Sequence, residues 1–190
     1  MEKLTGKDLW PNPVYEKARE EVRARIIRLK APRRLALGDS ATILFENRET
    51  LKYQIQELLR AESITSPAGI QEQLDVYNGL LPGEGELSAT LMIDVTEEAR
   101  IQETLRRLVG IDERLFLCFG PHEIRARFEE GRSDGKRVSA VQFIRFQLDL
   151  GARRDFLAAK TGRLELRHPE YQARADLDSE TLASLQADLG

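Results

Sequence analysis

Apolar residues recur every three or four positions through much of the first half of the chain, as they do along one face of a helix. The first predicted helix begins at Asn12-Pro13, where the asparagine would cap the helix and the proline would occupy its first position, and it ends before Pro32. A second helix is predicted from near Asn47 to Glu62, and a third opens at Pro67.

The segment Arg33–Phe45, between the first two helices, is predicted to form two short strands around the turn Gly38-Asp39-Ser40. After Pro82-Gly83, apolar and polar residues alternate, and Leu87–Val95 is the first long predicted strand. Next come a helix capped by Thr96 and ended by Gly110, and a strand over Arg114–Phe119. Two further strands, Glu123–Glu129 and Arg137–Leu148, are expected to form a hairpin joined through Gly131 and Asp134-Gly135. The last expected elements are a helix over Gly151–Lys160, a strand over Arg163–Arg167 and a final helix over Asp178–Leu189.

Helices followed by strands are typical of an α+β fold, here with a mainly antiparallel sheet in the second half packed by helices and with further helices at the N-terminus. A length of 190 residues suits one domain with a substantial core. We therefore expect a single domain over residues 1–190, with a helical part at about 1–82 and a strand-rich part at about 83–190.

The net charge of −3 conceals an uneven distribution of charge along the chain. Residues 16–34 contain eight basic and three acidic side chains, whereas residues 46–86 contain eight acidic and three basic ones. We expect these segments to face each other or water. The basic segment has no interleaved aromatic residues and the whole chain is acidic, which disfavours nucleic acid as a partner.

Cysteine and histidine content restricts the chemistry of the chain. Cys118 is the one cysteine, which excludes an internal disulfide, and with only two histidines a zinc site of thiolates and imidazoles is disfavoured. We expect Cys118 to be a small core residue, because His122 is the one nearby group that would lower its pKa. The apolar runs are too short to span a membrane and the N-terminus does not read as a secretory signal, so we expect a cytoplasmic, bacterial protein.

The second predicted helix carries more hydrogen-bonding side chains than a plain core helix needs. Two interpretations stay open: the polar groups lock the helix against its neighbours, or they line a pocket where arginine grips an anionic ligand and the amide orients it. The candidate ligand-binding residues are Arg48, Tyr53, Gln54, Glu57 and Arg60.

A catalytic or metal site is the alternative. Carboxylates of the second and third helices would converge with a histidine on a hard metal ion, or Glu57 and His168 would act as a metal-free acid–base pair. Solvated helix faces explain the same residues, and we favour that explanation. The candidate metal ligands are Glu57, Glu62, Glu72, Asp75 and His168.

Arginines of the predicted hairpin form one further group, Arg125, Arg127, Arg132, Arg137 and Arg145. They would make a cationic face for an acidic partner if they shared one side of the sheet, although ordinary solvated strand faces account for most such patterns.

Several segments of the chain resemble an uncharacterised bacterial family, domain of unknown function 3501. They are LTGKDLW, RRLALGDSATILFENRETLKYQIQELLRAE, GIQEQLDVYNGLLPGEGELSATLMIDV, ARIQETLRRLVGIDERLFL, SAVQFIRFQL and RHPEYQARADL. The resemblance covers essentially the whole length. Family members are often encoded near rubrerythrin-like proteins and iron–sulfur oxidoreductase subunits, so the resemblance implies an accessory role in peroxide or electron-transfer metabolism. A single cysteine does not hold a four-cysteine cluster.

These patterns favour a non-enzymatic binding or accessory protein over an enzyme, because no nucleophile–base motif or phosphate loop accompanies the polar helix. We expect a protein partner or a small anionic ligand, and we leave homo-oligomer formation open. The sequence identifies no cofactor.

Overall fold

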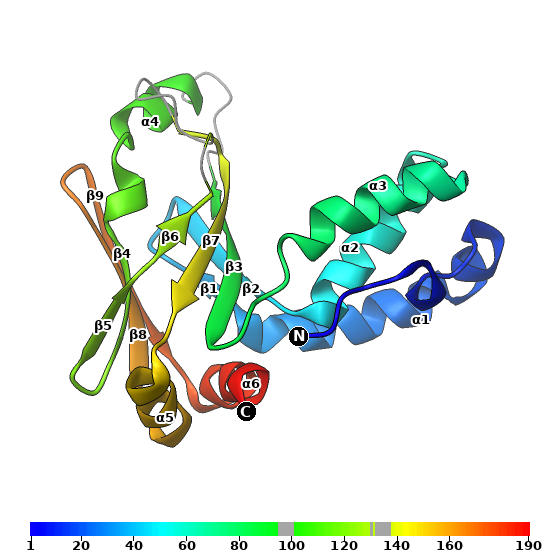
Figure 1. Ribbon diagram of the computed structural model, residues 1–190. Helices are drawn as coiled ribbons and strands as arrows, with labels where there is room; N and C mark the ends of the chain where they lie inside the picture. Colours follow the sequence, from blue (N-terminus) through cyan, green and yellow to red (C-terminus); the bar gives the residue numbers. More distant parts are fainter. Residues whose placement is uncertain (95–100, 130, 132–137) are drawn as a thin grey trace.

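The computed structural model describes residues 1–94, 101–129, 131 and 138–190. Within these residues the strands form two antiparallel sheets, and three long helices form an arm that projects from them (Figure 1). The predicted α+β fold class is therefore confirmed. None of the helices in this part of the chain combines the length and the hydrophobicity that a bilayer crossing requires.

Sheet A has the strand order β1-β2-β3-β7-β6. The strands of this sheet are β1 (Arg34–Ala36), β2 (Ala41–Glu46), β3 (Glu86–Ile93), β7 (Val141–Gln147) and β6 (Arg127–Phe128). Because β1 and β2 come from the N-terminal part of the chain, the helical and strand-rich parts share one sheet.

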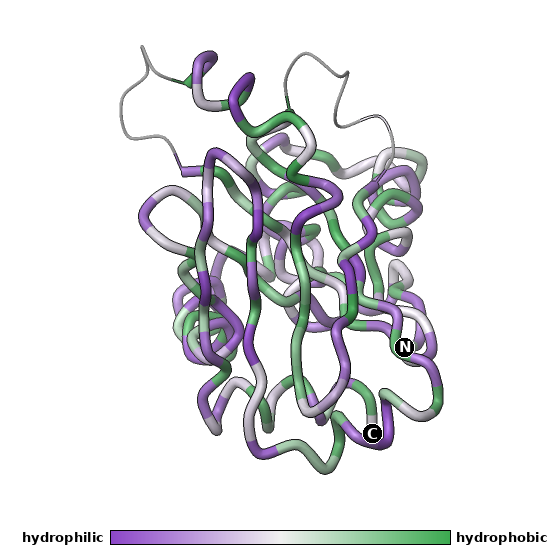
Figure 2. Tube along the Cα trace, turned by 90° about the vertical axis from the view of Figure 1, so that its left-hand side faces the viewer, coloured by the Kyte–Doolittle hydropathy of each residue, from purple (hydrophilic) through white to green (hydrophobic). Residues whose placement is uncertain are grey.

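Sheet B has the order β5-β4-β8-β9. The strands of this sheet are β5 (His122–Arg125), β4 (Leu115–Phe119), β8 (Gly162–His168) and β9 (Tyr171–Leu177). Figure 2 views the molecule from this side and shows hydrophobic and hydrophilic residues alternating along the strands. That alternation leaves one face of the sheet apolar, as expected for a sheet with one face on a core.

The apolar faces of the two sheets pack against each other and form the main core. Ile43 and Phe45 of sheet A and Leu117 and Leu164 of sheet B are all fully buried in one cluster. The ends of this sandwich are covered by α4 (Ile101–Arg107), η4 (Ile111–Glu113), α5 (Leu150–Ala158) and α6 (Ser179–Leu189).

The arm consists of η1 (Gly6–Asp8), α1 (Asn12–Lys30), α2 (Arg48–Ala61) and α3 (Pro67–Asn78), and η2 (Ala31–Arg33) leads from α1 into β1. It has its own smaller core, in which Leu51, Ile55 and Leu59 of α2 meet Leu74 of α3. These three leucine and isoleucine side chains of α2 therefore face α3, and the polar side chains on the other side of α2 are left to face α1.

Arg33 joins the arm to the rest of the molecule. It is only 1% exposed, and its Nε donates to the carbonyl of Phe45 at 2.9 Å. Its Nη1 donates to Ser184 Oγ at 2.9 Å and its Nη2 to the carboxylate of Asp188, both on α6. One buried guanidinium thus ties η2, β2 and the last helix together.

Three local expectations were wrong. Pro11 rather than Asn12 is the N-cap residue of α1, and Asn12 instead donates to the carbonyl of Leu59 at 3.1 Å. Strand β9 was missed, because alanines occupy half of its inward positions and weaken the alternation. The predicted strand Glu123–Glu129 is divided between the two sheets at Ala126. The expected cap Thr96 and turn Asp134-Gly135 lie outside the described residues.

We expect Asp188→Asn to lower the free energy of unfolding by about 3 kcal/mol, because it leaves the buried Arg33 charge without its counterion. Urea denaturation measures the change. Glu180→Gln, an exposed substitution on the same helix, should change it by less than about 0.5 kcal/mol. Equal effects of the two substitutions would contradict a special role for the buried pair.

Candidate functional site

The polar stripe of α2 forms the contact between α2 and α1. Glu49, Tyr53, Gln56, Glu57 and Arg60 follow one another at the spacing of one helix face. The ion pairs Arg25–Glu49 at 3.4 Å and Arg19–Glu57 at 2.9 Å connect the helices, so basic residues of the first segment do face acidic residues of the second.

Glu57 is the centre of this contact. Its Oε1 accepts hydrogen bonds from Tyr15 Oη at 2.6 Å and from Arg19 Nε at 2.9 Å, and its Oε2 accepts from Arg19 Nη2 at 2.9 Å. The Arg19 guanidinium, with help from the Tyr15 hydroxyl, lowers the pKa of Glu57 below its usual value. Burial and the neighbouring carboxylate raise the pKa of Tyr15. Both carboxylate oxygens of Glu57 therefore already accept hydrogen bonds from α1.

The other candidate ligand residues also contact partners within the chain. Arg48 Nη2 donates to Asp8 Oδ1 at 2.6 Å, and this bond lowers the pKa of Asp8 to about 2. Arg60 lies 3.8 Å from carboxylate oxygens of both Glu16 and Glu57. Both arginines thus have acidic neighbours already.

Gln54 points to a different place, the junction of the arm with sheet A. Its Nε2 donates at 3.0 Å to Glu46, a carboxylate that is 2% exposed. Glu46 also accepts from Thr50 Oγ1 at 2.5 Å and from Thr90 Oγ1 at 2.9 Å. The predicted constellation is therefore spread over separate contacts of α2.

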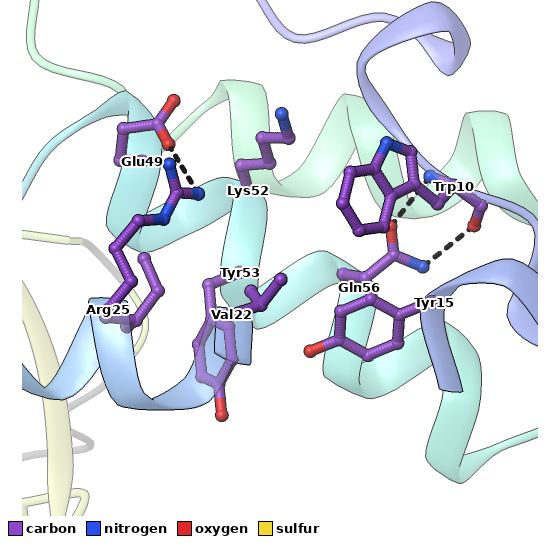
Figure 3. Close-up of a pocket in the computed structure, with 9 residues that line it drawn as sticks. Trp10, Tyr15, Val22, Arg25, Glu49, Lys52, Tyr53 and Gln56 are labelled. Carbon is purple, nitrogen blue, oxygen red and sulfur yellow. Dashed lines mark hydrogen bonds and ion pairs between the residues drawn. The ribbon is translucent and has the colours of Figure 1, made fainter. Parts of the chain in front are cut away.

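Tyr53 lies in a groove between α1 and α2 (Figure 3). Burial, followed by the charge of Glu57, raises its pKa, and Lys30 Nζ lies 5.4 Å from its ring centroid. Tyr15 and Val22 form the apolar wall of the groove, and Trp10 covers one end.

The backbone of Trp10 is held in place by the side chain of Gln56. Gln56, which is 4% exposed, accepts a hydrogen bond from the Trp10 N–H at 2.8 Å and donates one to the Trp10 carbonyl at 2.9 Å (Figure 3). The Trp10 residue is 43% exposed, and the centroid of its indole ring lies 6.5 Å from the ring centroid of Tyr15. The result is an exposed aromatic side chain on a fixed backbone.

Two grooves meet at Trp10. The groove between α1 and α2 encloses about 40 Å³ and has Arg25 and Lys52 among its lining residues. The second, at the tip of the arm, encloses about 480 Å³ and has only uncharged lining residues, including Leu9, Pro13 and Ile70. We call the Trp10 side chain and these two grooves the Trp10 surface.

The alternative metal ligands are not brought together. Glu62, Glu72 and Asp75 are exposed on the arm, whereas His168 is 5% exposed in sheet B. His168 Nε2 donates to the carbonyl of Val109 at 3.0 Å and Nδ1 accepts from the N–H of Glu170 at 3.2 Å. Among all described residues, no three His, Cys, Asp or Glu side chains are grouped so that they could hold a metal ion.

Cys118 is 5% exposed on the outer face of sheet B, and burial raises the pKa of its thiol. His122 does not contact it, and instead bonds Asp155 at 2.8 Å. The cation beside the thiol is Arg167, whose Nη2 donates to Cys118 Sγ at 3.8 Å, but burial has the larger effect on the thiol pKa, so the thiol is not activated.

A sequence model described as "Protein of unknown function (DUF3501)" matches residues 3–189. The chain belongs to this family. The DUF3501 chain is also similar to the crystal structure of a novel protein of unknown function from Burkholderia pseudomallei K96243, with a TM-score of 0.92, 34% sequence identity and 100% of each chain covered. No curated protein matches it.

Sequence reasoning missed Trp10 and Gln56 as a pair. Trp10 lies outside any periodic segment, and Gln56 was one of several amides on a polar helix. The available signal was the single tryptophan beside Pro11 and Pro13, a rigid aromatic position close to the start of a helix.

We expect Glu57→Gln to lower the free energy of unfolding by about 2 kcal/mol at neutral pH, because it removes a charge-assisted contact between α1 and α2. The pKa of Glu57 is depressed in the folded state, so its contribution is complete above the ordinary value of 4.5 and is lost as the pH falls below it. The gap between the variant and the unmodified protein should therefore narrow in acid.

Urea unfolding at about pH 7 and about pH 3 measures this gap. Glu72→Gln, at an exposed position of α3, is the matched control and should show no such dependence. A gap for Glu57→Gln that stays constant across this range would contradict the expected role of its charge.

Proposed function

We propose that this protein is a non-enzymatic binding protein of the cytoplasm that docks a partner protein on the Trp10 surface. The observation that supports it is the exposed Trp10 ring on a backbone fixed by buried Gln56. Tryptophan and tyrosine are enriched among the residues that dominate protein interfaces, and an anchor that is already ordered loses little entropy on binding.

The sizes of the two grooves fit side chains of a partner. A volume of about 40 Å³ is far below the several hundred that a drug-sized ligand occupies, and it suits one inserted apolar side chain. The tip groove, at about 480 Å³, is within the size range of small-ligand pockets, but its uncharged lining suits several apolar side chains better than a small anion. Together they favour an extended apolar contact with a protein.

Charge at the rim indicates which partner segment fits best. Lys52 lines the smaller groove, and its side chain makes no ion pair or hydrogen bond within the part of the chain that the structure describes. The side chain of Arg25 is 60% exposed, and its charge is partly balanced by an ion pair with Glu49. We therefore expect the partner to bring acidic residues next to its apolar anchor.

The proposed binding role also fits the state of the candidate catalytic groups. The Glu57 carboxylate accepts hydrogen bonds from Tyr15 and Arg19, so a proton-transfer role would first require these hydrogen bonds to break. The accessory place beside rubrerythrin-like or iron–sulfur redox proteins, which the family resemblance implies, is the setting in which we propose that this binding occurs.

We expect Trp10→Ala to abolish capture of the partner when the full chain is used as bait in an extract of its native cell. Val76→Ala is the matched control, because Val76 is 58% exposed on α3 and lines neither groove. Each recovered protein is then purified and tested by fluorescence. Trp10 is the single tryptophan of the chain, so its emission should shift to shorter wavelength when a partner covers it.

Proteins that bind the unmodified chain and the Trp10→Ala chain equally would contradict the proposal. So would binding that leaves the tryptophan emission unchanged, because the contact would then lie elsewhere. Turnover of a metabolite by the pure protein would favour the enzyme alternative.

A further inference from the structure

The outer face of sheet A carries two arginines at its β6 edge. Arg127 of β6 lies directly opposite Arg145 of β7, and Ser88 of β3 lies opposite Arg145 on the other side. Like charges that face each other on neighbouring strands destabilise the pair. An anion placed between these guanidinium groups would remove that repulsion.

Arg145 is held rigidly by the segment that connects α3 to β3. Its Nη1 donates to Glu86 Oε2 at 2.6 Å and to the carbonyl of Leu81 at 3.1 Å, and its Nη2 donates to the carbonyl of Gly79. Glu86 balances the charge of Arg145. Among the described residues the Nε–H of Arg145 makes no hydrogen bond, so it can donate to a further acceptor.

The charge of Arg127, unlike that of Arg145, is not balanced by an ion pair with a described residue. The Arg127 side chain is exposed, and within the described residues that side chain makes no hydrogen bond or ion pair. It lines a cavity of about 180 Å³ together with Arg145, Ser88 and Phe143. Glu129 also lines the cavity and is engaged in an interaction of its own.

We infer that this cavity binds a small oxyanion, a carboxylate or phosphate group, through the guanidinium of Arg127 with the Nε–H of Arg145 as second donor. The planar fork of arginine matches both kinds of oxyanion by paired hydrogen bonds. The Ser88 hydroxyl donates to the carbonyl of Leu80 at 2.8 Å, so Ser88 forms part of the wall and not a donor to the anion.

The cavity also limits the size of the ligand. A cavity of about 150 Å³ holds one benzene molecule, so about 180 Å³ accommodates a phosphate ion or a carboxylate on one small ring or short chain. The aromatic ring of Phe143 and the side chain of Leu80 supply an apolar wall for such a carbon skeleton. This site is separate from the Trp10 surface, and its test does not depend on the proposed function.

The test is calorimetric titration of the full chain with inorganic phosphate and, separately, with benzoate, at constant ionic strength set with chloride. Saturable binding of one or both is expected, and the stronger of the two identifies the ligand class. Arg127→Gln should weaken that binding about tenfold or more. Its melting temperature without ligand should not fall, because the Arg127 side chain has no partner to lose among the described residues and the substitution relieves the repulsion with Arg145.

Arg125→Gln is the matched control. Arg125 is exposed two positions earlier in the chain, but on β5 of sheet B, where it lies opposite Phe116 and outside the cavity. It should leave the affinity unchanged. The inference is overturned if neither anion binds saturably, or if Arg125→Gln and Arg127→Gln weaken binding equally, since that would indicate only a general effect of charge.

Discussion

The buried guanidinium of Arg33 is the constraint on which the arrangement of the molecule depends. A charge that is 1% exposed is stable only if every donor has an acceptor and the charge has a partner. Phe45, Ser184 and Asp188 satisfy it, and they belong to β2 and α6. These bonds hold η2, at the base of the arm, against both β2 and the last helix.

From that fixed base, the arm is held together by two different kinds of contact on opposite faces of α2. One face packs Leu51, Ile55 and Leu59 against α3, and the other pairs Glu57 with Tyr15 and Arg19 of α1. The polar face fixes the orientation of α1 relative to α2, because hydrogen bonds are specific in angle and distance. It is this orientation that brings Gln56 under Trp10 and leaves the indole ring at the surface.

Much of the fold was predictable from residues that act locally. Helix α2 begins next to Asn47 and α6 next to Asp178, close to where each was expected, since both side chains accept from backbone N–H groups of the first turn. What escaped prediction depends on distant partners. The split at Ala126 depends on which strands lie on either side, and the pairing of Arg48 with Asp8 spans 40 positions in sequence. The sequence pattern of the polar residues on α2 is the same whether they face a ligand or α1, so the sequence alone does not distinguish these two arrangements.

The division at Ala126 has a mechanical consequence for the sandwich. One continuous stretch of backbone pairs with β4 in sheet B through β5 and, immediately afterwards, with β7 in sheet A through β6, while the Ala126 N–H donates to the carbonyl of Leu115 at 2.8 Å. The two sheets are therefore joined here by consecutive residues with no loop between them, so displacing one sheet along the other would break backbone hydrogen bonds on at least one side of Ala126.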